Sequence, residues 1–123
     1  MSETLKNWKV TSAIPELEAG YCHVWQIDFS NTDIDCMTTY NPSFLSVQEC
    51  ERSEKFLSSN DKVRYKVIRS VLRQLLSTYL QLPPNKIKID FNRFGKPFLN
   101  HQHPVTPFYF NISHAKDLAL LAF

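Results

Sequence analysis

Apolar residues recur at helical spacing over residues 61–82 (DKVRYKVIRSVLRQLLSTYLQL), which makes this segment the clearest element of the chain. At about 100° per residue the apolar positions fall on one broad face, as expected for a helix that covers a core. Pro83 and Pro84 are expected to end this helix, because proline disfavours helical geometry in the residue before it. The apolar face comprises Val63, Val67, Ile68, Val71, Leu72, Leu75, Leu76 and Tyr79.

Shorter segments on either side of this helix have the patterns of strands and of a second helix. Residues 21–29 are rich in aromatic and β-branched side chains, and residues 86–91 alternate charged with apolar positions, so both are expected to be strands. Residues 43–59 are a helix candidate, with capping-box spacing between Ser46 and Glu49. Residues 108–113 and 118–123 are predicted to form two strands joined by a short hairpin connection. This order predicts an α+β fold, with the long helix packed on a small, mostly antiparallel sheet.

Charge is distributed unevenly along the 123 residues, although the net charge is only +2. Residues 1–50 hold two lysines and seven acidic residues, whereas residues 51–100 hold eleven basic and four acidic residues. A basic second half would attract phosphates, nucleic acid or an acidic protein surface, or it would simply be a solvated helix face. Within it, a basic stripe lies on the long helix opposite the apolar face and consists of Lys62, Lys66, Arg69 and Arg73.

This basic stripe has two further interpretations besides a solvated face. Aromatic residues do not interleave with it and no nucleic-acid-binding motif accompanies it, so nucleic acid is not predicted as a partner. An acidic helix of a partner protein would also fit the stripe. Arg64 differs from these residues, because it points into the apolar face between Val67 and Val71. Since a buried guanidinium destabilises unless it is paired, Arg64 is expected either to meet a structural carboxylate or to face a cleft and an anionic ligand.

The compartment is predicted from the cysteines and from the apolar runs. No apolar run approaches the roughly 20 residues of a membrane-spanning helix, and the N-terminus lacks the layout of a secretory signal. Three cysteines, an odd number without a C-x-x-C pair, suit a reducing compartment better than a disulfide framework. These features predict a cytoplasmic protein without a membrane partner.

Ser113 and His114 lie where the strand over 108–113 ends. Neighbouring strand residues point to opposite faces and the chain has no G-x-S-x-G elbow, so a serine hydrolase is not predicted. The histidines at 101 and 103 lack the spacing of a zinc site, so no metal ligands are predicted. Taken alone, Ser113 would be a turn hydroxyl bonded to its own backbone, and His114 a satisfied core or edge histidine.

Phosphate binding fits these residues better. Gly95, followed by Lys96 and Pro97, predicts a tight turn or bulge that presents Lys96 at its tip. A lysine supplies a point charge, while a serine hydroxyl and a histidine ring donate hydrogen bonds to phosphate oxygens. Lys96, Ser113 and His114 would therefore converge on a polyanion together with the basic helical region.

Two motifs in this region occur together, F-G-K-P at 94–97 and F-N-I-S-H at 110–114. They follow a helix of the form D-x-x-R-x-x-x-x-R-x-x-L-R and an L-P-P exit. This set resembles the N-terminal half of the surfactin-synthetase-type 4'-phosphopantetheinyl transferases over residues 44–123, and residues 1–43 add only an expected first strand. The resemblance implies transfer of 4'-phosphopantetheine from coenzyme A to a serine of an acyl- or peptidyl-carrier protein. It also implies a single domain over 1–123, which forms one half of a pseudo-dimer with coenzyme A in the cleft between the halves.

The resemblance also implies roles for individual residues around the turn and the strand end. Lys96, Ser113 and His114 would hold the phosphates of coenzyme A. Gly95 and Pro97 would shape the turn that carries the lysine.

Three helical positions complete the set that the resemblance implies. Arg52 would lie near the 3'-phosphate of coenzyme A, and Arg64 at or just behind the coenzyme site. Glu49 stands where some family members have a second basic residue. Because coenzyme A carries a 3'-phosphate and a pyrophosphate, it needs several cationic or donor groups on separate elements, as this set provides.

Two motifs of the family do not occur in these 123 residues. One is G-x-D-x-E, whose acids hold Mg²⁺, and the other is W-x-x-K-E-[AS], which supplies a third metal-site acid and a lysine. Without them nothing neutralises charge on the pyrophosphate leaving group and no base prepares the carrier-protein serine. The 123 residues alone are therefore expected to lack transferase activity and to need a C-terminal half or a second chain. The alternative is a non-enzymatic half-domain that binds coenzyme A or a carrier protein and pairs with another chain.

Overall fold

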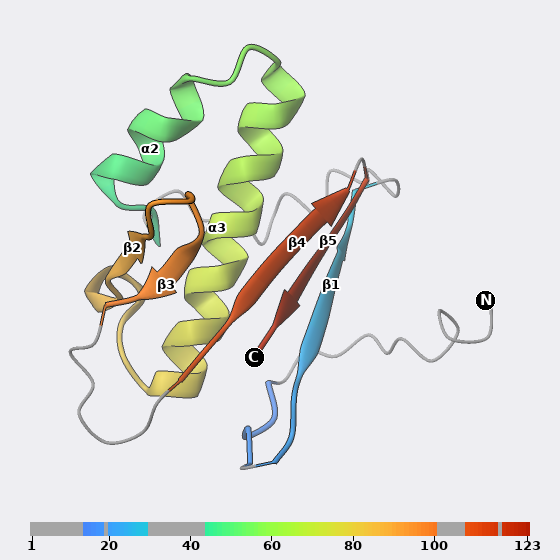
Figure 1. Cartoon of the computed structure of the whole chain (residues 1–123), viewed down its shortest axis with the longest axis vertical. Helices are drawn as coiled ribbons and strands as arrows, with labels where there is room; N and C mark the ends of the chain where they lie inside the picture. Colours follow the sequence, from blue (N-terminus) through green and yellow to red (C-terminus); the bar gives the residue numbers. More distant parts are fainter. Residues whose placement is uncertain (1–13, 19, 30–43, 101–107, 116) are drawn as a thin grey trace.

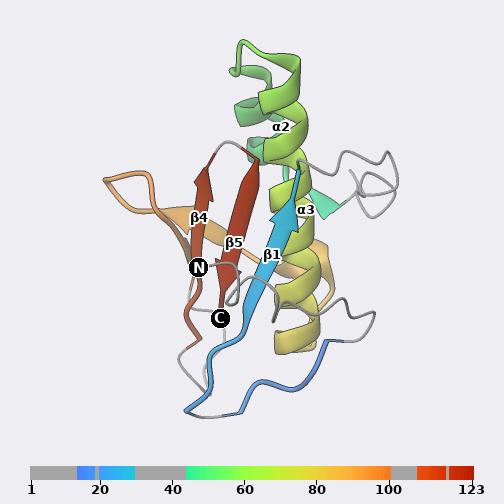
Figure 2. The same ribbon diagram turned by 90° about the vertical axis from the view of Figure 1, so that its right-hand side faces the viewer.

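The structure is a computed structural model that describes residues 14–18, 20–29, 44–100, 108–115 and 117–123. Figure 1 shows α3 lying against one face of the three-stranded sheet, and Figure 2 turns the other face of that sheet toward the viewer. The predicted α+β class is confirmed. In chain order the elements are β1 (Val24–Asp28), α2 (Val47–Glu54), α3 (Ser59–Leu80), the 3-10 helix η3 (Pro84–Lys86), β2 (Ile89–Phe91), β3 (Pro97–Leu99), β4 (Asn111–Ala115) and β5 (Leu118–Ala122).

The strands form two separate antiparallel sheets. One has the order β1-β5-β4, and the other is the hairpin of β2 and β3. On the central strand β5, Ala119 and Leu121 face α3 and are fully buried. Burying such side chains stabilises the fold by about 1.5–3 kcal/mol for each large apolar residue. The core cluster comprises Leu72, Leu75, Leu76, Ile87, Phe110, Ala119, Leu121 and Phe123.

Helix α3 is displaced by two residues from its expected bounds. It begins after Ser58, whose side chain accepts a hydrogen bond from the backbone N–H of Asp61. It ends before the two prolines, because Gln81 has a left-handed backbone (φ 56°) and donates its N–H to the Ser77 carbonyl. The predicted apolar face is otherwise confirmed, although Val63 at its edge is 37% exposed.

Helix α2 starts with the predicted capping box. The Ser46 side chain accepts from the Glu49 N–H at 3.1 Å, and the Glu49 carboxylate accepts from the Ser46 N–H at 2.9 Å. The helix is shorter than residues 43–59 and stops at Glu54. The predicted capping box is therefore confirmed, and it fixes the position of the Glu49 side chain.

The expectation that the basic stripe of α3 is solvated, or free to meet a partner, is wrong for its two arginines. Arg69 and Arg73 are only 4% and 3% exposed, because α2 packs on this side of α3 and supplies Glu49 between them. The two lysines of the stripe lie 3.6 and 3.9 Å from the carboxylate of Glu54. A helical wheel gives the direction of a side chain but not what covers it, and here a second helix does.

The bounds of the last strands also differ from expectation. Strand β4 begins at Asn111 and continues to Ala115, so His114 lies within the strand and not in the connection. Ala115 pairs with Leu118, which shortens the hairpin connection to residues 116–117. Neither α2 nor α3 is long and apolar enough to cross a bilayer.

Candidate anion-binding site

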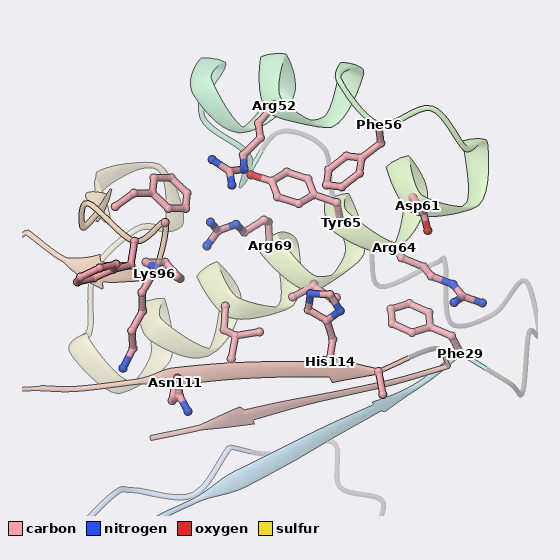
Figure 3. Close-up of a pocket in the computed structure, with 17 residues that line it drawn as sticks. Phe29, Arg52, Phe56, Asp61, Arg64, Tyr65, Arg69, Lys96, Asn111 and His114 are labelled. Carbon is pink, nitrogen blue, oxygen red and sulfur yellow. The ribbon is translucent and has the colours of Figure 1, made fainter.

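A pocket of about 810 Å³ opens between the two helices, the β2–β3 hairpin and β4. Figure 3 shows Arg52, Arg69 and His114 reaching toward it from α2, α3 and β4. The sequence predicted seven site residues, and six of them line this pocket. They are Arg52, Arg64, Gly95, Lys96, Pro97 and His114.

The charges around the pocket are mostly positive. Among the lining residues, the charged cations are three arginines and one lysine, His114 adds an imidazole ring, and the only acid is Asp61. Because apolar rings also line the pocket, the field of these cations is screened less there than on an open surface. The pocket therefore favours an anionic ligand.

The turn that carries Lys96 is built by Asn92 and Gly95. The Asn92 side-chain oxygen accepts from the backbone N–H groups of Phe94 and Lys96, both at 2.9 Å, and the Asn92 carbonyl accepts from Gly95 N–H at 2.9 Å. Gly95 has φ +82°, which is strained for residues with a side chain. The predicted turn is confirmed, and it fixes the backbone from which Lys96 extends.

Arg52 and Arg69 meet at one aromatic ring of the hairpin. Their guanidinium carbons lie 4.7 and 5.0 Å from the centroid of Phe91. Cation–π contacts of this kind are worth about 0.5–1 kcal/mol at exposed sites and more when desolvated. They position both guanidiniums beside the hairpin.

Arg64 combines the two alternatives left open by the sequence. Its Nη2 donates to Asp117 Oδ1 at 2.8 Å, and its guanidinium lies 5.3 Å from the ring of Phe29. The predicted carboxylate partner is therefore confirmed. The side chain is 28% exposed and lines the pocket, so it is less buried than its place on the helix indicated.

His114 and Ser113 lie on opposite faces of β4, as neighbours in a strand do. His114 pairs with Ala119, which faces α3, whereas Ser113 pairs with Leu120 on the other face. Ser113 is exposed and is not among the residues that line the pocket.

The pocket residues that were not expected from the sequence include Tyr65, Arg69 and Phe91. Tyr65 and Arg69 are four residues apart on α3 and therefore lie on the same side of the helix as each other. The i, i+4 spacing of Tyr65 and Arg69 could have indicated from the sequence that these two side chains lie together. No sequence signal indicated Phe91, because its role depends on how the β2–β3 hairpin packs against α2.

Within the described ranges, no group of three or more His, Cys, Asp or Glu side chains lies close enough to hold a metal ion. These residues therefore do not fit a magnesium site.

Comparison with known proteins assigns the family. Residues 34–123 match the family model described as 4'-phosphopantetheinyl transferase, N-terminal. The chain is 30% identical over 100 residues to the 4'-phosphopantetheinyl transferase HetI of a Nostoc species, covering 81% of this chain and 41% of that protein. It is 35% identical over 77 residues to the human L-aminoadipate-semialdehyde dehydrogenase-phosphopantetheinyl transferase, covering 61% of this chain and 25% of that protein. The chain belongs to the 4'-phosphopantetheinyl transferase family, and it spans less than half the length of these relatives.

Proposed function

We propose that the pocket binds the phosphates of coenzyme A. The observation that carries this proposal is the convergence of Arg52, Arg64, Lys96 and His114, from four separate parts of the fold, on one pocket. A volume of about 810 Å³ is within the range of small-molecule sites. Coenzyme A has three phosphates, and a pocket with cations on several walls can contact them separately.

The reaction proposed for the whole protein is transfer of 4'-phosphopantetheine to a carrier-protein serine. The serine hydroxyl would give its proton to a base of the C-terminal half or second chain, and its oxygen would form a bond to the phosphorus next to pantetheine. Adenosine 3',5'-bisphosphate would leave with the electron pair of the broken P–O bond. Lys96, His114 and Arg52 would hold the phosphates and offset their negative charge. Ser113, as predicted from the sequence, would donate from the edge of β4.

The proposal extends to the subfamily of the protein, its partners and its cellular compartment. The paired F-G-K-P and F-N-I-S-H motifs support the surfactin-synthetase-type subfamily. An acyl- or peptidyl-carrier protein would be the acceptor, and the Mg²⁺ ligands would come from a C-terminal half or a second chain. The greater length of the relatives supports this arrangement. The protein would act in the cytoplasm.

Calorimetric titration with coenzyme A tests the proposed ligand. Lys96→Gln is expected to weaken binding about tenfold, because a hydrogen bond to a charged group contributes about 1.5 kcal/mol or more. Dephospho-coenzyme A should bind more weakly than coenzyme A, and Arg52→Gln should reduce this difference.

The matched control is Lys88→Gln, since Lys88 is exposed and does not line the pocket. It should bind coenzyme A as the parent chain does. Equal affinities for Lys96→Gln and Lys88→Gln would contradict the assignment of the pocket. Mass spectrometry of an apo carrier protein, with and without the C-terminal half present, would separate the transferase from the alternative of a non-enzymatic binding half-domain.

A further inference from the structure

Unsatisfied polar atoms gather at the helical wall of the pocket. Among the described residues, four buried side-chain nitrogen or oxygen atoms lack a hydrogen-bond partner, and three of them are Glu49 Oε2, Tyr65 Oη and Arg69 Nη1. Leaving such a group unsatisfied costs about 1–3 kcal/mol, more if it is charged. Such a concentration at one place indicates a site whose partner comes from outside the described residues.

Both donors are held by their surroundings. Tyr65 packs on the ring of Phe56, with centroids 5.3 Å apart, and the Arg69 guanidinium lies 5.5 Å from the Tyr65 ring. Arg69 also lies against Phe91, and its Nε is 3.6 Å from Glu49. Figure 3 shows Arg52, Tyr65 and Arg69 grouped on the helical wall of the pocket. The two donors are therefore held in place before a ligand arrives.

A partner that satisfies both Tyr65 Oη and Arg69 Nη1 as donors would be an acceptor, and an anion suits the charged guanidinium. Tyr65 Oη and Arg69 Nη1 can both donate, whereas the third atom, Glu49 Oε2, is an acceptor that lies 3.6 Å from Arg69 Nε. Arg69 keeps several N–H groups beyond the one nearest Glu49, in the planar arrangement that suits the oxygens of a phosphate.

We propose that Tyr65 Oη and the Arg69 guanidinium form a second phosphate-contacting wall of this pocket, with Glu49 as the residue that positions Arg69. This inference rests on the proposed function only in that the phosphate would belong to coenzyme A. The wall adds two donors on α3 to those that the sequence predicted on α2, α3, the hairpin and β4.

The test measures binding of inorganic pyrophosphate and of coenzyme A by calorimetry, using the full 123-residue chain. Tyr65→Phe removes one hydroxyl, and its matched control is Tyr109→Phe, because Tyr109 is 73% exposed and does not line the pocket. Arg69→Gln is matched by Arg93→Gln, which is likewise exposed and outside the pocket lining. Circular dichroism verifies that each variant is folded.

Tyr65→Phe and Arg69→Gln are each expected to weaken pyrophosphate binding roughly tenfold or more, because each removes a hydrogen bond to a charged group. The two controls should bind as the parent does. If Arg69→Gln fails to fold, Tyr65→Phe still decides the question. A folded Tyr65→Phe with parental affinity for pyrophosphate and coenzyme A would overturn the proposal, since a water molecule would then satisfy the hydroxyl.

The outcomes also separate this inference from the proposed function. Binding of coenzyme A that depends on Lys96 but not on Tyr65 or Arg69 would overturn only the second wall. Binding of pyrophosphate that depends on Tyr65 and Arg69, without any binding of coenzyme A, would support the wall and contradict the proposed ligand. A parent chain that binds neither compound would overturn both.

Discussion

Arg73 donates from Nε to Glu49 Oε1 at 2.6 Å, and the two side chains are only 4% and 5% exposed. The same guanidinium donates from Nη1 to the carbonyls of Pro84 and Ile87 at 3.0 and 2.6 Å. Glu49 in turn accepts from the Ser46 N–H at the start of α2. One buried ion pair therefore connects the first turn of α2, the middle of α3 and the segment that leads into the hairpin.

Glu49→Gln is expected to destabilise the fold by about 3–5 kcal/mol, because it leaves Arg69 and Arg73 buried without a countercharge. Glu51→Gln is the matched control, since Glu51 is exposed on the same helix, and it should change stability by less than about 0.5 kcal/mol. Urea unfolding gives both values. Equal free energies of unfolding for the two variants would show that the buried pair contributes nothing measurable.

Gly95→Ala tests the turn that carries Lys96. At φ +82° an added side chain costs about 1–2 kcal/mol, so the turn should shift and coenzyme A affinity should fall several-fold. Gly20→Ala is the control, because Gly20 has φ +87° but does not line the pocket. It should lose similar stability and keep its affinity. An unchanged affinity in Gly95→Ala would mean that the turn geometry does not matter for the ligand.

Tyr79 makes stability depend on pH in the alkaline range. Burial raises the pKa of its hydroxyl above the usual value of 10.0, the bond from Trp25 Nε1 lowers that pKa, and Cys22 raises it. Above about pH 10 the unfolded chain therefore loses this proton first, so stability should fall as pH rises toward the folded pKa. Below about pH 10 the contribution is constant.

Urea unfolding between pH 9 and pH 11 checks this prediction. The Tyr79→Phe variant should lose stability less steeply than the parent over this interval. Tyr109→Phe, at an exposed tyrosine, should follow the parent curve. Parallel curves for Tyr79→Phe and the parent would rule out a raised pKa at Tyr79.

Leu76→Ala tests the contact between α3 and the sheet. Leu76 is fully buried in the core cluster, so its truncation should cost about 2–5 kcal/mol. Leu57→Ala removes the same atoms from a fully exposed side chain and should have little effect. The two melting temperatures, measured side by side, provide the comparison, and similar values would contradict the assigned core.

Local patterns were enough to predict most of the fold and several of the residues that line the pocket. The period of α3 predicted its core face, the capping box of Ser46 was visible in the sequence, and Gly95 marked the turn. Arg69 was assigned to a solvated face because a helical wheel does not show that α2 covers it. The contribution of Phe91 depends on the packing of the hairpin, which no short-range pattern encodes.

The pocket lies between two sheets that share no backbone ladder in the described part of the chain. A phosphate that contacts Lys96 of the hairpin and His114 of β4 would connect them, so its binding energy would also resist their separation. Amide hydrogen exchange should then slow in both sheets together when coenzyme A is added. The free energy of coenzyme A binding is thus expected also to stabilise the packing of the two sheets against each other.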